Sequence, residues 1–153
     1  MGLFENRADK RSVQFLLIGL LMFLVTPGLV FAECLQKRKT PTAPGEFLKM
    51  QNPVPLNDAN LKAAETIYQL SGKPITCKTC HGVKGDGIAE SGFESTPPPR
   101  NFSCAKTMSA LPDGQLFWII RNGSPKTSMF AFPSLSDKQV WQLIHYLRQF
   151  SKK

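Results

Sequence analysis

Histidine and cysteine are scarce in this chain, which has two histidines and four cysteines among 153 residues. A structural zinc site commonly needs two pairs of cysteine or histidine ligands. The only histidine besides His81 is His145, and no cysteine is near it in the sequence. No stretch shows the period-two alternation of apolar and polar residues that is typical of β-strands. These shortages argue against a zinc module and against a β-sheet fold.

Acidic side chains are also outnumbered, 11 against 19 lysines and arginines, which gives a formal charge of +8. So basic a chain could bind nucleic acid, an anionic membrane or an acidic protein. It lacks a motif of interleaved aromatic and basic residues of the nucleic-acid-binding kind. We therefore expect no nucleic-acid partner and predict that most of the lysines are simply solvated.

The most informative motif is Cys77-Lys78-Thr79-Cys80-His81, because C-x-x-C-H is an attachment sequence for a c-type haem. Two thiols at this spacing can reach two vinyl groups of one porphyrin, and the adjoining imidazole can bind the iron. A C-x-x-C pair alone would also suit a thioredoxin-like redox site, half of a zinc site or a disulfide. The adjoining histidine favours haem attachment, with His81 as an axial ligand.

Residues 1–32 have the pattern of a secretory signal peptide. Three basic residues precede an uncharged stretch over 12–32, whose apolar run is interrupted at Pro27, and a small residue, Ala32, precedes the expected cleavage site. An uncleaved membrane anchor is the rival interpretation, since about 20 apolar residues can span a bilayer. The shortness of the run before Pro27 favours cleavage, so we expect export, with membrane contact only if this segment is retained.

Two cysteines remain outside the motif, Cys34 and Cys104. In an oxidising compartment they could form a disulfide, and free thiols are the next alternative. Lipid modification of Cys34 is disfavoured, because Glu33 stands where a lipoprotein signal has a small residue.

Three segments have the apolar spacing of amphipathic helices: residues 57–72, residues 112–121 and the segment that begins at Ser136. Asn57 or Asp58 can cap the first helix, and Ser136 with Gln139 forms a capping box at the start of the last. Residues 33–56 are rich in proline and lack periodicity, which predicts an extended arm or linker with no packed element. The sequence therefore predicts an all-α fold with its chemistry carried on loops.

The second axial ligand of the predicted haem is expected to be Met129, which lies in an aromatic loop before the last helix. A thioether is a soft ligand that raises the reduction potential. Met108 is the competing ligand and His145 a weaker one. A methionine among phenylalanines is more commonly core filler, so the residues alone leave this assignment open.

Together, the C-x-x-C-H motif after a first helix, the Gly-Asp-Gly loop at residues 85–87 and the methionine loop resemble a mono-haem class I cytochrome c of the bacterial soluble type. The resemblance covers about residues 58–150, within a predicted domain at 57–153. It implies three to five helices around one haem, the first and last crossing at a right angle, in a periplasmic protein. Cys77 and Cys80 would form the thioethers of one covalently bound haem c. His81 and Met129, the latter in a Met-x-x-Phe-Pro segment, would be the iron ligands.

The resemblance also implies contacts around the haem. Ala64 and Tyr68 of the first helix would pack against Trp141 or Tyr146 of the last. Because Tyr68 lies unusually far before the motif, we expect Ser71–Thr76 to bulge out. A proline carbonyl would accept from the second nitrogen of the ligand histidine, and the candidates are Pro97, Pro98 and Pro99.

The predicted function is one-electron transfer without enzymatic activity, because both axial positions of the iron are filled. The expected pocket walls are Phe102, Leu116, Phe130 and Phe132. Lysines near the exposed haem edge could steer the protein to acidic patches on redox partner proteins; these are Lys78, Lys84 and Lys126. The alternative is a haem c subunit of a larger oxidoreductase complex. A third possibility is an enzyme or gas sensor with an open iron site.

Overall fold

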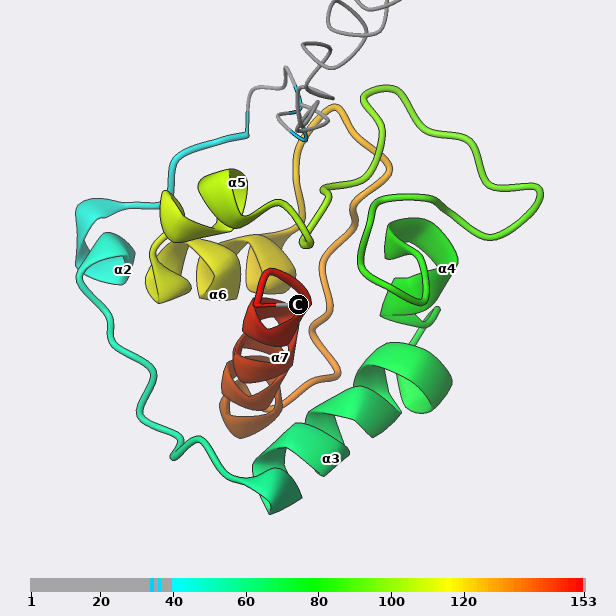
Figure 1. Ribbon diagram of the computed structural model, residues 1–153. Coiled ribbons are helices and arrows are strands. Elements are labelled where there is room, and N and C mark those ends of the chain that lie inside the picture. The colour runs from blue at the N-terminus through cyan, green and yellow to red at the C-terminus, as the bar shows by residue number, and fades with distance from the viewer. Residues whose placement is uncertain (1–33, 35, 37–39, 153) are drawn as a thin grey trace, which may run out of the picture. The chain divides into compact units, whose positions relative to one another are not determined.

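The computed structural model describes Cys34, Gln36 and residues 40–152 (Figure 1). The predicted signal peptide lies outside these described residues. The helices are α2 (Gly45–Leu48), α3 (Asp58–Thr66), α4 (Cys77–His81), α5 (Ala105–Ser109), α6 (Asp113–Asn122) and α7 (Asp137–Phe150), with a π-helical turn η2 (Ile67–Ser71) continuing α3. The described part of the chain contains no strand, so the predicted all-α class is confirmed.

The pairing of α3 with α7 builds the centre of the fold (Figure 1). The Asn57 side chain caps α3 by accepting from the Asn60 amide, and the predicted capping box of Ser136 and Gln139 is formed at the start of α7. The predicted apolar face of α7 is buried. Ala64 is fully buried on α3, where its small side chain allows the close approach of another helix. Local caps and apolar spacing therefore place both helices.

Tyr68 connects the first helix to the last through aromatic contacts. Its ring centroid lies 5.4 Å from that of Tyr146 and 5.2 Å from that of Phe150. Trp141, the other predicted partner, instead stacks on Phe117 at 4.4 Å. The Tyr68 hydroxyl donates to the Gly82 carbonyl at 2.8 Å, so this buried side chain also ties α3 to the end of α4.

The long interval between Tyr68 and the motif begins in the π-helical turn η2. The Gly72 amide donates to the Ile67 carbonyl at 3.0 Å, one residue farther back than in an α-helix. The chain then turns before α4, so the irregular stretch starts a few residues earlier than the bulge expected at Ser71–Thr76.

Helix α6 begins after Pro112 and ends at Gly123, close to the predicted limits of 112–121. The Arg148 Nε of α7 donates to the Asp113 carboxylate at 3.0 Å, which joins the end of α7 to the start of α6. Helix α5 was not predicted, because a single helical turn contains too few residues to show a periodic pattern.

Of the arm at residues 33–56, the described part from residue 40 onward is packed, contrary to the expectation from its proline content. It contains α2, whose Phe47 ring stacks on Phe117 of α6 at 6.4 Å. A Cβ at Gly114 would lie 1.6 Å from the Phe47 carbonyl oxygen, so only glycine admits this approach of α2 to α6. The packing depends on a residue of α6 that carries no side chain, a signal that the arm's own sequence does not contain.

Hydrogen bonds hold the arm on both sides of α2. The Gln115 side chain accepts from the Ala43 amide at 2.8 Å and donates to the Pro41 carbonyl at 3.1 Å. Farther along, the Asn52 side chain donates to the Trp141 carbonyl at 2.9 Å. Cys34 is joined to the buried Cys104 by a disulfide, with Cα atoms 5.4 Å apart. The predicted disulfide is therefore confirmed, and these two cysteines are not free thiols.

Candidate functional site

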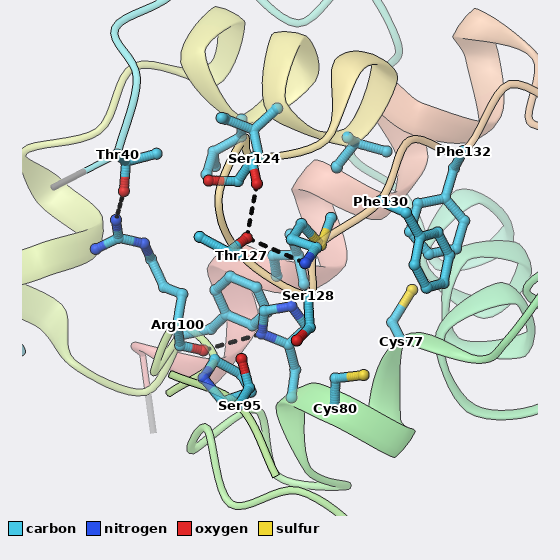
Figure 2. Close-up of a pocket in the computed structure, with 18 of the residues that line it drawn as sticks. Thr40, Cys77, Cys80, Ser95, Arg100, Ser124, Thr127, Ser128, Phe130 and Phe132 are labelled. Atoms are coloured by element: carbon cyan, nitrogen blue, oxygen red, sulfur yellow. Dashed lines mark hydrogen bonds between the residues drawn. The ribbon is translucent and has the colours of Figure 1, made fainter. Parts of the chain in front are cut away.

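An apolar cavity lies among α4, α6, α7 and the loop at residues 124–135 (Figure 2). Its empty space is about 1120 Å³, including the part open to solvent. The eight predicted site residues all line it: Cys77, Cys80, His81, Phe102, Leu116, Met129, Phe130 and Phe132. Phe102, Leu116 and Phe132 are buried, whereas Phe130 is 41% exposed and lies at the rim.

Helix α4 presents the two thiols of the motif to this cavity. Cys77 and Cys80 belong to one helical turn, which places them on the same side of the helix. Burial raises the pKa of the Cys77 thiol to about 12, and burial, followed by the charge of Glu90, raises the pKa of Cys80. Catalytic and redox-active thiols have lowered pKa values. The pair therefore fits attachment to an apolar group better than a thioredoxin-like site.

The ring of His81 is oriented by two neighbours. Its Nδ1 lies 3.0 Å from the Arg100 carbonyl oxygen, a contact drawn as a dashed line in Figure 2. Because a carbonyl can only accept, Nδ1 carries the proton, and in the neutral ring Nε2 keeps the lone pair needed to bind a metal. Phe102 stacks on the ring at 4.5 Å. The accepting residue thus lies directly after the three prolines among which we expected it, which corrects that prediction by one position.

The loop that carries Met129 is closed by its own hydrogen bonds. The Ser124 amide donates to the Met129 carbonyl at 2.8 Å, and the Met129 amide donates to the Thr127 hydroxyl at 3.1 Å. Gly123 begins the loop with φ +73°, and a Cβ there would lie 2.7 Å from the Met129 carbonyl oxygen. The backbone of Met129 is therefore fixed at the cavity wall.

The competing ligands lie elsewhere. Met108 is 1% exposed within the hydrophobic core and is not part of the cavity wall. The Nε2 of His145 lies 2.6 Å from the Val54 carbonyl oxygen, so its ring helps to hold the arm. Of the three candidates, Met129 alone reaches the cavity.

The cavity wall is largely apolar, but it also includes polar residues that were not predicted from the sequence. Among them are Thr40, Arg100, Gln115 and Ser124. Figure 2 shows Arg100 and Ser124 on the side away from Cys77. The Ser124 hydroxyl is buried without a hydrogen-bond partner among the described residues. A ligand with an apolar body and a polar edge would suit this division.

The donor set fits a covalently held haem. Two thiols on one helical turn, an imidazole and a thioether surround a largely apolar space. A thiolate metal site is not supported, since no cluster of three histidine, cysteine or acidic residues that could hold a metal occurs in the described part of the chain.

The three lysines considered for partner docking differ in their surroundings. Lys78 forms an ion pair with Glu90 at 3.4 Å, which offsets its charge. Lys84 and Lys126 are exposed. Within the described ranges, no helix is long and apolar enough to cross a bilayer.

Comparison with known proteins gives a family and places solved structures beside this chain. The family model described as cytochrome c oxidase, cbb3-type, subunit III matches residues 59–147. No curated protein matches the chain. A chain of the reducing HAO-like protein complex of Kuenenia stuttgartiensis is similar, with 24% sequence identity and a TM-score of 0.50. The similarity covers 66% of this chain and 49% of that one, so this chain spans about half the length of that relative. The likeness concerns the fold alone.

Proposed function

This chain belongs to the family described as cytochrome c oxidase, cbb3-type, subunit III, and from that premise we propose that it transfers single electrons through one haem c bound covalently to Cys77 and Cys80. A cytochrome c domain implies electron transfer by haem c; the attachment residues, the number of haems and the ligands are the proposal. The proposal rests on one observation: two thiols, an imidazole and a thioether all line the same apolar cavity.

In this proposal the chain holds the iron from two sides. His81 binds it through Nε2 while the Arg100 carbonyl accepts from Nδ1 and fixes the ring. Met129 binds it from the loop at residues 124–135. When bound, the haem supplies an iron that changes between Fe(II) and Fe(III). If His81 and Met129 both held the iron, no position on it would remain for a substrate.

The walls of the cavity support this role. Phe102, Leu116 and Phe132 are buried and would keep water away from a bound haem. An apolar surrounding and a thioether ligand both favour the ferrous state, which raises the reduction potential.

Absorption spectroscopy of the purified protein tests the proposal directly. We expect a low-spin spectrum in both oxidation states, with a thioether-to-iron band in the ferric form. The pigment should remain with the chain after denaturation, since thioether bonds survive unfolding. A chain that loses its pigment on denaturation would contradict covalent attachment.

We also propose that the protein acts after export, in the periplasm, and meets redox partner proteins with acidic docking patches. The basic composition and the exposed Lys84 and Lys126 support such encounters. Association rates with an acidic partner should fall as ionic strength rises, because screening shortens the range of the attraction. An association rate that does not depend on salt would argue against the lysine role.

The second candidate function is a haem c subunit held in a larger oxidoreductase complex. The family takes its description from an oxidase subunit, and the related structure belongs to a protein complex. The arm packs against its own domain through hydrogen bonds on both sides of α2. Size-exclusion chromatography of the native extract separates the two: a carrier elutes near its own mass, and a subunit elutes with its complex.

A further inference from the structure

Within the arm, Gln36 binds the chain segment that lies next to His81 of the cavity. Its side-chain amide donates to the Pro99 carbonyl at 2.8 Å, and its side-chain oxygen accepts from the Asn101 amide at 2.8 Å. These two backbone groups flank Arg100, whose carbonyl lies 3.0 Å from Nδ1 of His81. Gln36 therefore binds the short segment that contains the Arg100 carbonyl, the hydrogen-bond acceptor for His81.

Two neighbouring links keep Gln36 in place. Cys34, two residues before it, is joined to Cys104 by the disulfide. After it, the hydroxyl of Thr40 accepts a hydrogen bond from the guanidinium of Arg100 (Figure 2). The arm thus binds the two residues that flank Arg100 through Gln36, and the Arg100 side chain through Thr40.

We propose that Gln36 is a positioning residue for the iron ligand: by fixing residues 99–101, it sets the strength of the hydrogen bond between His81 Nδ1–H and the Arg100 carbonyl. This inference takes His81 as the ligand and so rests on the proposed function. A strong hydrogen bond at Nδ1 makes the imidazole a better electron donor at Nε2. A better donor stabilises ferric iron and lowers the reduction potential.

The test compares Gln36→Ala with the wild-type holoprotein. Loosening residues 99–101 should weaken the histidine hydrogen bond and favour ferrous iron. At a fixed ambient potential, the ferric-to-ferrous ratio should fall by about threefold to tenfold, at the low end of the effects of outer-shell changes. A tenfold change corresponds to about 59 mV for one electron. Exchange of the Nδ1 proton of His81 with solvent, followed by NMR, should become faster by a similar factor.

Gln142→Ala is the matched control, because the buried Gln142 side chain also makes a hydrogen bond, donating to Asn60 at 2.8 Å, away from the cavity wall. It should lower stability and leave the potential and the proton exchange unchanged. Gln36→Glu keeps the acceptor for the Asn101 amide and loses the donor to Pro99, so we expect intermediate values. If Gln36→Ala does not fold, the reduction potential and the proton exchange of Gln36→Glu still test the inference.

Two results would overturn the inference. In one, both Gln36 variants keep the wild-type potential and the wild-type exchange rate of the histidine proton. In the other, Gln142→Ala shifts the potential as much as Gln36→Ala does, which would trace the effect to general destabilisation. Failure of the proposed function looks different, because the wild-type protein itself would then lack the spectrum of a histidine-ligated haem.

Discussion

Met129 lies far along the chain from His81, yet both side chains line the same cavity. If Met129 binds the iron opposite His81, the site is closed to small ligands. Met129→Ala should open it, so that the ferrous variant binds carbon monoxide readily and the wild type does so weakly. The reduction potential should also fall, by on the order of 0.1 V within the roughly 0.8 V range that axial ligands set.

A conservative change in the core provides the control for this prediction. Met108→Leu alters a buried methionine outside the cavity wall, so carbon monoxide binding should remain at the wild-type level. A wild-type protein that binds carbon monoxide as readily as Met129→Ala would show that the iron site is open, and the electron-carrier proposal would then be wrong.

Tyr68 offers a second prediction for a single residue, through pH. Burial is the main cause that raises its pKa above the ordinary value of about 10. The unfolded state therefore releases the tyrosine proton first, and the stabilising contribution of Tyr68 is complete below pH 10 and is lost as pH rises. At neutral pH, Tyr68→Phe should lower the free energy of unfolding by about 1–2 kcal/mol, because the buried Gly82 carbonyl loses its donor.

Above pH 10 the difference between wild type and Tyr68→Phe should narrow, by up to about 1.4 kcal/mol per pH unit. Denaturant titrations at pH 7 and at pH 11 measure this difference in the free energy of unfolding. Other titrating groups act on both proteins alike and cancel in the comparison. A difference that stays constant over this interval would mean that Tyr68 ionises as easily in the folded protein as in the unfolded one.

At the scale of the elements, the contact between α2 and α6 depends on Gly114. An added methyl group would meet the Phe47 carbonyl at 1.6 Å, so the backbone of α2 would have to move. Gly114→Ala should therefore lower the free energy of unfolding by about 1–3 kcal/mol, despite the better helix propensity of alanine. Gly45→Ala is the matched control, because nothing lies within 4 Å of its Cβ position. Its effect should stay within about 0.5 kcal/mol.

Chemical denaturation of Gly114→Ala and Gly45→Ala measures the two free energies of unfolding and so checks both predictions. Equal stabilities would mean that α2 is a loosely attached arm, as its proline content suggests, and that its packing contributes nothing to the folded domain.

The elements that could be predicted from the sequence are those whose signals are local. The helices α3 and α7 have side-chain caps, α6 lies between Pro112 and Gly123, and all three show apolar spacing. The Cys77–His81 motif needs only adjacent residues. For this reason their positions, and the cavity that the predicted residues surround, agree with expectation. The roles of these residues as attachments and ligands remain predictions.

The remaining features depend on contacts between residues distant in sequence. The packing of the arm needs Gly114 to lack a side chain and Gln115 to bond two arm residues. The acceptor for His81 is the carbonyl of Arg100, a backbone group that any residue possesses, so residue type could not identify it. Whether Tyr146 or Trp141 meets Tyr68 depends on how α7 is rotated against both α3 and α6.

For the whole molecule, the disulfide between Cys34 and Cys104 closes a loop over a sequence separation of 70 residues that includes the motif and the arm. A cross-link over such a loop stabilises a domain by about 2–4 kcal/mol, chiefly by restricting the unfolded chain. Cys34→Ser should lower the free energy of unfolding by this amount. Cys34 is the residue to replace, because Cys104 is fully buried and its sulfur accepts from the Thr107 hydroxyl at 3.2 Å.

Reductant distinguishes this cross-link from the thiols of the motif. Dithiothreitol should destabilise the wild type to the level of Cys34→Ser and leave that variant unchanged, because thioether bonds at Cys77 and Cys80 are not reduced by thiols. Denaturant titrations with and without reductant measure the four free energies. If the wild type and Cys34→Ser unfold alike without reductant, the arm is held by its hydrogen bonds and by α2 alone, and the cross-link adds nothing to the stability of the domain.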